Sequence, residues 1–111
     1  DRPLWAVFQP HTYSRTRALW GAFVECLGQA DHVIVLDVYP ARETDSMGVD
    51  PAALAAQVAC ADARHVPDFG TAVAYLQSHV EPNAVVLSLS AGDGNQVAVR
   101  LLEQLAELQR E

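Results

Sequence analysis

The sequence predicts a three-layer α/β/α domain with a mainly parallel sheet of about four strands. Short apolar runs alternate with segments of helical periodicity along the whole chain. Each apolar run is followed by one helical segment, and such a strand–helix repeat gives parallel strands with helices on both faces. The chain has 111 residues, half of them apolar, which is enough to bury the core of one Rossmann-like domain.

The first half of the chain predicts two strands and two helices. Residues 4–8 are an apolar run, and residues 13–27 follow with helical periodicity. Residues 32–39 (HVIVLDVY) are nearly continuously apolar, as buried parallel strands are. A second helix is expected from its N-cap Asp50 to about Cys60. The predicted inward faces of these helices consist of Trp20, Phe23, Val24 and Leu27, and of Leu54 and Val58.

The second half repeats this pattern twice. Residues 63–67 (ARHVP) predict a short strand, and Asp68 is the expected N-cap of the helix that follows. Residues 84–89 (AVVLSL) predict the fourth strand, which precedes the last helix. The predicted inward faces of the two helices consist of Phe69, Val73, Leu76 and Val80, and of Ala98, Leu101, Leu105 and Leu108.

Composition excludes several classes of function. The formal net charge of −7 argues against a nucleic acid or an anionic membrane as partner, and no apolar run is long enough to span a membrane. The chain contains no lysine, so it lacks the residue that a Walker-type loop places on the phosphates of ATP. Cys26 and Cys60 show no metal-ligand spacing. They predict thiols of a cytoplasmic protein, with no metal site.

Polar side chains gather after three of the predicted strands, in residues 9–15 (QPHTYSR), 37–50 (DVYPARETDSMGVD) and 90–96 (SAGDGNQ). The carboxyl ends of parallel strands meet at one edge of a sheet, where such folds bind ligands. Arg15 and Arg17 fall in the first turn of the helix predicted over 13–27, where the helix dipole disfavours cations. A bound carboxylate or phosphate would offset this cost.

Simpler roles compete with a binding site in these segments. Thr12 can serve only as a helix cap, and Arg42 and Glu43 can form a surface ion pair of little energetic value. A nucleotide- or phosphate-binding module would use residues 90–96 as an anion loop. That signal is weak, because Val97 stands where a dinucleotide loop has its third glycine.

Three segments, FQPHTYSRT (8–16), LDVYPARE (36–43) and SAGDGNQV (90–97), resemble the C-terminal domain of the Mur ligases in order and content. The resemblance spans nearly the whole chain and is closest to the branch that joins L-alanine to UDP-N-acetylmuramate. It implies a cytoplasmic ligase of peptidoglycan synthesis that uses ATP and Mg²⁺. A related ligase that recycles murein peptides is the nearest alternative.

The resemblance also implies how the domains of such a ligase divide the work. An N-terminal domain holds the UDP-sugar, a central domain carries the ATP phosphate loop, and the C-terminal domain closes over both and binds the amino acid. Residues 1–111 correspond to this closing domain, shortened at its N-terminus. Because the phosphate loop belongs to another domain, neither catalytic residues nor metal ligands are expected here, and the isolated domain is expected to be inactive.

Site residues follow from the same resemblance. His11 and Arg15 match positions that face the amino acid, with Arg15 as the partner of its carboxylate, and Tyr13 supports the turn between them. Thr12 stands where many members have arginine. Asp93 is the one candidate for a cofactor contact. The complete set of expected substrate-binding residues is His11, Thr12, Tyr13, Arg15, Asp37, Tyr39, Arg42 and Glu43.

A further expectation concerns the strand predicted over 84–89. In the family, the domain begins with additional strands, one of which lies beside this one. Without that neighbour, residues 84–89 form an apolar sheet edge that has neither lysine nor internal proline to protect it. We therefore expect two copies of the chain to pair along this edge, as an antiparallel two-fold pair.

Overall fold

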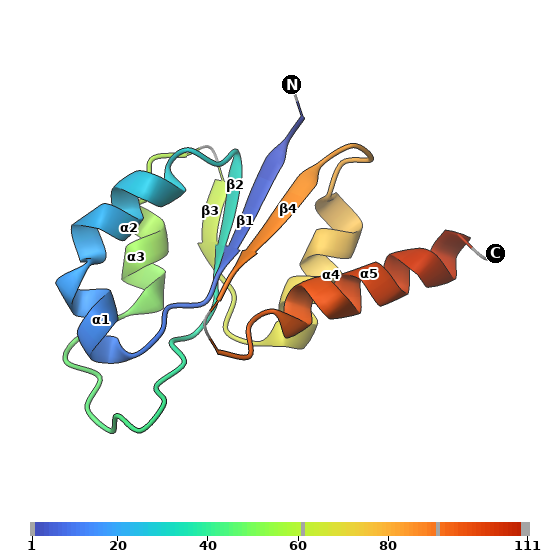
Figure 1. Cartoon of the computed structure of the whole chain (residues 1–111). Helices are drawn as coiled ribbons and strands as arrows, with labels where there is room; N and C mark the ends of the chain where they lie inside the picture. The colour runs from blue at the N-terminus through green and yellow to red at the C-terminus, as the bar shows by residue number, and fades with distance from the viewer. Residues whose placement is uncertain (1, 61, 91, 110–111) are drawn as a thin grey trace.

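The computed structural model describes residues 2–60, 62–90 and 92–109, which form a three-layer α/β/α domain (Figure 1). Four parallel strands, in the order β3-β2-β1-β4, make up the middle layer. Helices α1, α2 and α3 cover one face, and α4 and α5 cover the other. The predicted fold class is thus confirmed. The elements are β1 (Leu4–Phe8), α1 (Tyr13–Ala18), α2 (Trp20–Leu27), β2 (His32–Val35), α3 (Pro51–Gln57), β3 (Asp62–His65), α4 (Phe69–His79), β4 (Val85–Leu89) and α5 (Gln96–Gln109).

The sheet separates two apolar cores. Successive side chains of a strand point to opposite faces. Trp5 and Val7 of β1 therefore pack with α4 and α5, whereas Ala6 and Phe8 pack with α2 and α3. The predicted inward residues of the helices contribute to these cores, with two exceptions. Ala98 belongs to neither core, and its neighbour Val97 is buried in its place. The side chain of Leu108 lies outside the described residues. Fully buried members of the predicted helix faces are Leu27, Leu54, Val58, Val73, Leu76 and Leu101.

The single helix predicted over 13–27 is wrong, because the chain leaves helical geometry at Leu19, where φ is −109° and ψ is 16°. The two resulting helices are held by different partners. In α1, Thr16 is buried and its hydroxyl donates to the carbonyl of Thr12 at 2.7 Å. In α2, the indole of Trp20 donates to Gln57 Oε1 of α3 at 2.9 Å. The sequence has continuous helical periodicity over these residues. That periodicity therefore does not reveal that two helices with different hydrogen-bond partners form here.

Two predicted elements end early. The strand predicted over 32–39 pairs as regular sheet only to Val35, and beyond it the amide of Leu36 donates to the carbonyl of Phe8 at 2.9 Å. The helix expected to reach Cys60 ends at Gln57. Val58 adopts extended dihedrals there and buries its side chain in the core, with 6% of its surface exposed. Burial of one apolar side chain overrides the local helical preference.

A polar cluster lies at the amino-terminal ends of the strands, opposite the edge where the predicted site residues gather. Asp62 accepts hydrogen bonds from Arg64 at 2.7 Å and Tyr75 at 3.2 Å, and lies 3.1 Å from His32 Nδ1. Nε2 of His32 lies 3.4 Å from a Glu81 carboxylate oxygen. Partial burial tends to raise the pKa of Asp62, but the hydrogen bonds from Arg64 and His32 outweigh it and lower this pKa below its ordinary value of 3.8.

This pKa shift predicts a dependence of stability on pH. Since the pKa of Asp62 is lower in the folded chain, its contribution to stability is present above pH 3.8 and is lost as the pH falls through the folded-state value. Asp62→Asn should therefore lower the melting temperature at pH 7 and make its fall below pH 4 less steep. Thermal unfolding followed by circular dichroism between pH 7 and pH 2.5 measures this. Parallel melting curves of the two proteins at every pH would contradict it.

Candidate functional site

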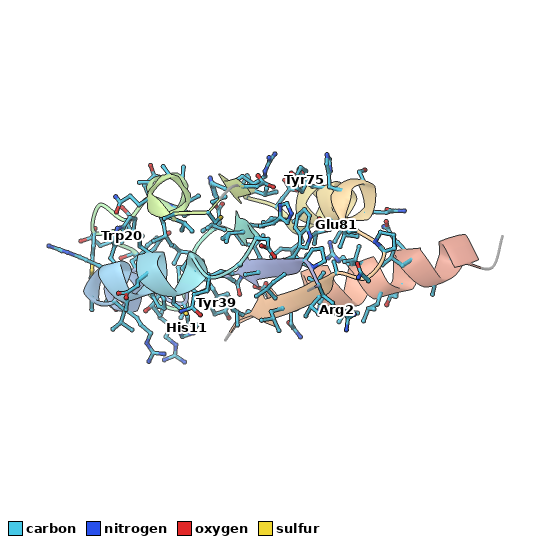
Figure 2. All side chains as sticks on the ribbon, turned by 90° about the horizontal axis from the view of Figure 1, so that it is seen from above. Arg2, His11, Trp20, Tyr39, Tyr75 and Glu81 are labelled. Carbon is cyan, nitrogen blue, oxygen red and sulfur yellow. The ribbon has the colours of Figure 1, made fainter. Side chains whose placement is uncertain are left out.

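The segments that follow β1, β2 and β4 meet at the carboxyl-terminal edge of the sheet, at the bottom of Figure 1. The amide of Tyr39 donates to the carbonyl of Pro10, and the amide of Thr12 donates to the carbonyl of Tyr39, both at 2.8 Å. These bonds place the His11 and Tyr39 rings beside each other, with centroids 5.7 Å apart and planes inclined by 16° (Figure 2). His11 and Tyr39, both expected site residues, thus lie together at this edge of the sheet.

Glu43, another expected site residue, caps α1. Its carboxylate accepts hydrogen bonds from the amides of Tyr13 and Ser14 and from the hydroxyl of Ser14. The Ser14 hydroxyl is the largest cause of a lowered pKa for Glu43. Burial opposes it, and the backbone bonds and His11 act in the same direction as the hydroxyl. A carboxylate of the chain itself therefore occupies the N-terminus of α1, and the sequence-based ion pair of Glu43 with Arg42 is wrong.

Arg15 and Arg17 lie on a helix that is shorter than predicted. Because α1 ends at Ala18 it has only six residues, so Arg15, its third residue, belongs to the first turn as well as to the last, whereas Arg17 lies only in the last turn, where the dipole favours cations. The expected dipole cost therefore does not apply to Arg17. Both side chains are exposed. Among the described residues, the ion pairs include neither of these arginines nor Arg42.

Thr12 combines capping with an unusual backbone. Its hydroxyl accepts from the amide of Arg15 at 3.2 Å, which confirms the capping interpretation. Its φ of +60° lies in a region that β-branched residues rarely adopt and that costs about 1–3 kcal/mol. Strained backbone of this kind concentrates at ligand-binding positions. Thr12 thus connects His11 to the helix that carries Arg15.

Asp37 has a partner that sequence reasoning missed. Its carboxylate lies 2.6 Å from Nε2 of His65, the last residue of β3. The side chain of Asp37 is 59% exposed and that of His65 is 23% exposed. The available signal was a histidine at the carboxyl end of a strand, the position at which the other predicted site residues occur. Asp37 is therefore connected to β3, in contrast to Tyr39, which contacts the segment after β1.

The glycine segment, defined as Ser90 and residues 92–94, does not offer an open anion loop. The amide of Gly94 donates to Gln9 Oε1 at 2.8 Å and to Ser90 Oγ at 3.1 Å, and the amide of Gly92 donates to Ser90 Oγ at 3.2 Å. Asp93 accepts from Nε2 of Gln9 at 2.8 Å. Phosphate loops bind through available amides, whereas these two amides already have partners and a carboxylate lies beside them. The geometry thus disfavours the nucleotide-binding alternative.

Within the described ranges 2–60, 62–90 and 92–109, no three His, Cys, Asp or Glu side chains come close enough together to hold a metal ion. Cys26 and Cys60 are free thiols. None of the helices in these ranges has both the length and the hydropathy needed to cross a membrane.

The chain is an α/β domain with parallel strands whose polar ends converge on one edge, the edge at which such folds bind ligands. Comparison with known families is more specific. Residues 1–92 match the family model described as "Mur ligase, glutamate ligase domain". The chain belongs to the Mur ligase family, and it corresponds to the C-terminal domain of these enzymes.

Curated relatives that match the chain carry the name UDP-N-acetylmuramate--L-alanine ligase. The protein of Syntrophotalea carbinolica is 41% identical over 110 residues, which are 96% of this chain and 24% of the relative. Those of Mycobacterium avium and Acidithiobacillus ferrooxidans are each 44% identical, over 79% and 83% of this chain and over 18% and 20% of their own lengths. The chain therefore spans about a quarter or less of the relatives it matches.

Proposed function

We propose that this chain is the closing, amino-acid-binding domain of an ATP-dependent UDP-N-acetylmuramate–L-alanine ligase of cytoplasmic peptidoglycan synthesis. One observation carries the proposal. The chain matches ligases of that name over nearly its whole length, and the segments on which the resemblance rests are those that meet at the carboxyl-terminal edge of the sheet. The murein-peptide ligase is the alternative, because the geometry of the site does not distinguish L-alanine from an L-alanyl peptide as the group that is joined.

Within the proposed site, each residue has a distinct task. Arg15 binds the carboxylate of L-alanine, because an exposed guanidinium without an ion-pair partner in the described part of the chain offers a planar pair of donors. His11, stacked on Tyr39, borders the amino acid on the adjacent side. Glu43 orders the first turn of α1, which carries Arg15. Thr12, Tyr13, Asp37 and Arg42 complete the proposed substrate-binding set.

ATP and Mg²⁺ are assigned to the rest of the ligase. When bound there, ATP supplies the activation of the carboxyl group of UDP-N-acetylmuramate. The occupied amides of the glycine segment and the absence of lysine support this assignment. Asp93, the candidate for a cofactor contact, accepts a hydrogen bond from Gln9, and we assign it a structural role. We expect the isolated chain to release no phosphate from ATP above a control without protein.

A chimaeric ligase tests the proposed function. In this protein, the matching segment of the Syntrophotalea carbinolica relative is replaced by residues 1–111 of this chain. We expect phosphate release from ATP that requires both UDP-N-acetylmuramate and L-alanine. The same assay with an L-alanyl peptide in place of L-alanine tests the alternative. A folded chimaera that binds UDP-N-acetylmuramate and ATP but does not use L-alanine would overturn the proposal.

Self-association of the 111-residue chain is proposed on separate grounds. β4 is an edge strand, and its Leu87 and Leu89 are 45% and 40% exposed. The amide of Val85 and the carbonyl of Leu89 bond to the segment of β1. By the alternation of a parallel ladder, the amides of Val86 and Ser88 point to the open edge. An antiparallel pair of β4 strands would satisfy them.

Light scattering on Ser88→Pro tests this pairing. The substitution removes an edge amide without touching the ladder to β1, so the variant should be monomeric at concentrations where the parent chain is a dimer. Ser88→Ala is the matched control, because the Ser88 hydroxyl has no hydrogen-bond partner among the described residues and the amide is kept. A parent chain that stays monomeric at millimolar concentration would disprove self-association.

A further inference from the structure

Gln9, the residue directly after β1, is buried, with 5% of its surface exposed, although its side chain is polar. Its Oε1 accepts from the amide of Gly94 at 2.8 Å and from the hydroxyl of Ser90 at 2.7 Å, and its Nε2 donates to Asp93 at 2.8 Å. A carboxamide oxygen has two lone pairs, and both are used here. Gln9 is therefore committed to the glycine segment rather than available to a ligand.

The glycine segment fits between Gln9 and Tyr39 only because it lacks side chains at two positions. A Cβ at residue 94 would lie 2.7 Å from Cβ of Gln9. A Cβ at residue 92 would lie 2.6 Å from Cγ of Tyr39. Both distances are too short for carbon atoms in contact. Little space therefore separates the backbone of Gly92 from the tyrosine ring, and a displacement of the segment toward Tyr39 by more than the width of a methyl group would move the ring.

Tyr39 transmits such a movement to His11. The two rings stack, and the backbone of Tyr39 bonds to Pro10 and Thr12 on either side of His11. A continuous set of contacts therefore runs from Gln9 through the glycine segment and Tyr39 to His11. In Figure 2, His11 and Tyr39 lie together, to the left of Glu81 and Arg2.

We propose that Gln9 is a positioning residue of the amino-acid site, which holds the glycine segment against Tyr39 and thereby fixes the orientation of His11. The effect of Gln9 on catalysis rests on the proposed function. The effect of Gln9 on the position of His11 does not. The side chain touches neither substrate nor reacting atoms. Its effect on the reaction passes through the contacts of Tyr39.

Exchange of donor and acceptor between Gln9 and Asp93 provides a sharp test. Gln9→Glu places a second carboxylate opposite Asp93 and removes the donor, so the pair becomes repulsive. Asp93→Asn alone keeps an acceptor oxygen for Gln9 and should change little. Combining both substitutions restores the bond with its direction reversed, because the amide of the new asparagine can donate to the new glutamate.

The first readout is NMR of the 111-residue chain. Gln9→Glu should shift the amide resonances of Gly92 and Gly94 and the ring resonances of Tyr39 and His11, and the double variant should return them to their places in Asp93→Asn. The shifts should diminish in acid, where one of the facing carboxyls takes up a proton. Gln29→Glu, the same change at an exposed glutamine, is the matched control.

The second readout is kinetic and uses the chimaeric ligase. Gln9→Glu should lower kcat/KM for L-alanine, by up to about 100-fold if His11 is displaced by about 1 Å. KM for ATP should stay the same, and the double variant should recover most of the loss. Recovery by a reversed hydrogen bond is not expected of a residue that only fills space.

A second variant covers the case in which Gln9→Glu does not fold. Gly92→Ala leaves the bonds of Gln9 in place but pushes directly on the Tyr39 ring, and it should move the Tyr39 and His11 resonances alone. Unchanged His11 resonances in the folded variants, or no recovery in the double variant, would overturn the proposal. Inability of the parent chimaera to use L-alanine would count against the proposed function, while the NMR result still decides the role of Gln9.

Discussion

Arg15→Ala in the chimaeric ligase should lower kcat/KM for L-alanine by about 10- to 100-fold. Loss of a charge-assisted hydrogen bond in a closed site costs about 1.5–3 kcal/mol, which corresponds to this range. Because Arg15 is exposed and has no ion pair in the described part of the chain, its removal should not disturb the fold. The effect should appear in the L-alanine parameters, with KM for ATP and for UDP-N-acetylmuramate nearly unchanged.

Arg17 provides the matched control, since it lies on the same short helix with the same charge and is also exposed. Arg17→Ala should change kcat/KM for L-alanine by less than about threefold, whereas His11→Ala should lower it in the same direction as Arg15→Ala. Steady-state phosphate release at varied L-alanine concentration measures all three. Equal values for Arg15→Ala and the parent chimaera would remove Arg15 from the site.

Trp5→Ala should lower the free energy of unfolding by about 3–5 kcal/mol, the largest effect on stability that we expect of one substitution in this chain. The Trp5 side chain is 1% exposed and belongs to the core beneath α4 and α5. Its indole stacks on His32 with centroids 4.0 Å apart and donates to Glu81 at 2.7 Å. Domains of this size are stable by about 5–15 kcal/mol, so the variant should lie near the limit of folding.

Substitution of Trp20 serves as a control, because it shows how much stability is lost when an indole that is not fully buried is removed. Trp20 is only half-buried, and its hydrogen bond to Gln57 lies at the surface. Trp20→Phe should therefore cost less than about 1 kcal/mol, and Trp5→Phe, which keeps a ring in the core, should cost less than Trp5→Ala. Urea unfolding followed by far-UV circular dichroism measures the series. A Trp5→Ala variant as stable as Trp20→Phe would contradict the assigned role of Trp5.

Much of the candidate site could be predicted from the order of residues along the chain. Apolar periodicity predicts four parallel strands, and strand direction then places the segments after β1, β2 and β4 at one edge. His11 and Tyr39 follow from this placement, and the structure brings them together. His65 and Gln9 were missed, since a histidine at a strand end and a polar residue after an apolar run resemble ordinary solvent-facing residues.

Partner choice among the charged residues could not be predicted. A surface ion pair with its neighbour Arg42 was the simpler alternative for Glu43, but Glu43 bonds to Tyr13 and Ser14, about thirty positions earlier in the chain. The position of Arg17 relative to the helix dipole was also misjudged, because helical periodicity continues through Leu19 while the first helix ends at Ala18. Charged side chains pair with whatever the fold brings near them, and proximity along the chain is a poor guide to that.

The sequence by itself determined the class of fold, the inward face of each helix and the edge of the sheet at which the site lies. These features depend on the local alternation of apolar and polar residues. That alternation decides which side of each helix or strand is removed from water by the hydrophobic effect. Only the tertiary structure decided the bend at Leu19, the capping of α1 by Glu43 and the burial of Gln9 against the glycine segment. Each of these depends on a hydrogen bond or a packing contact between distant segments, and such contacts exist only once the sheet and its two helical layers are assembled.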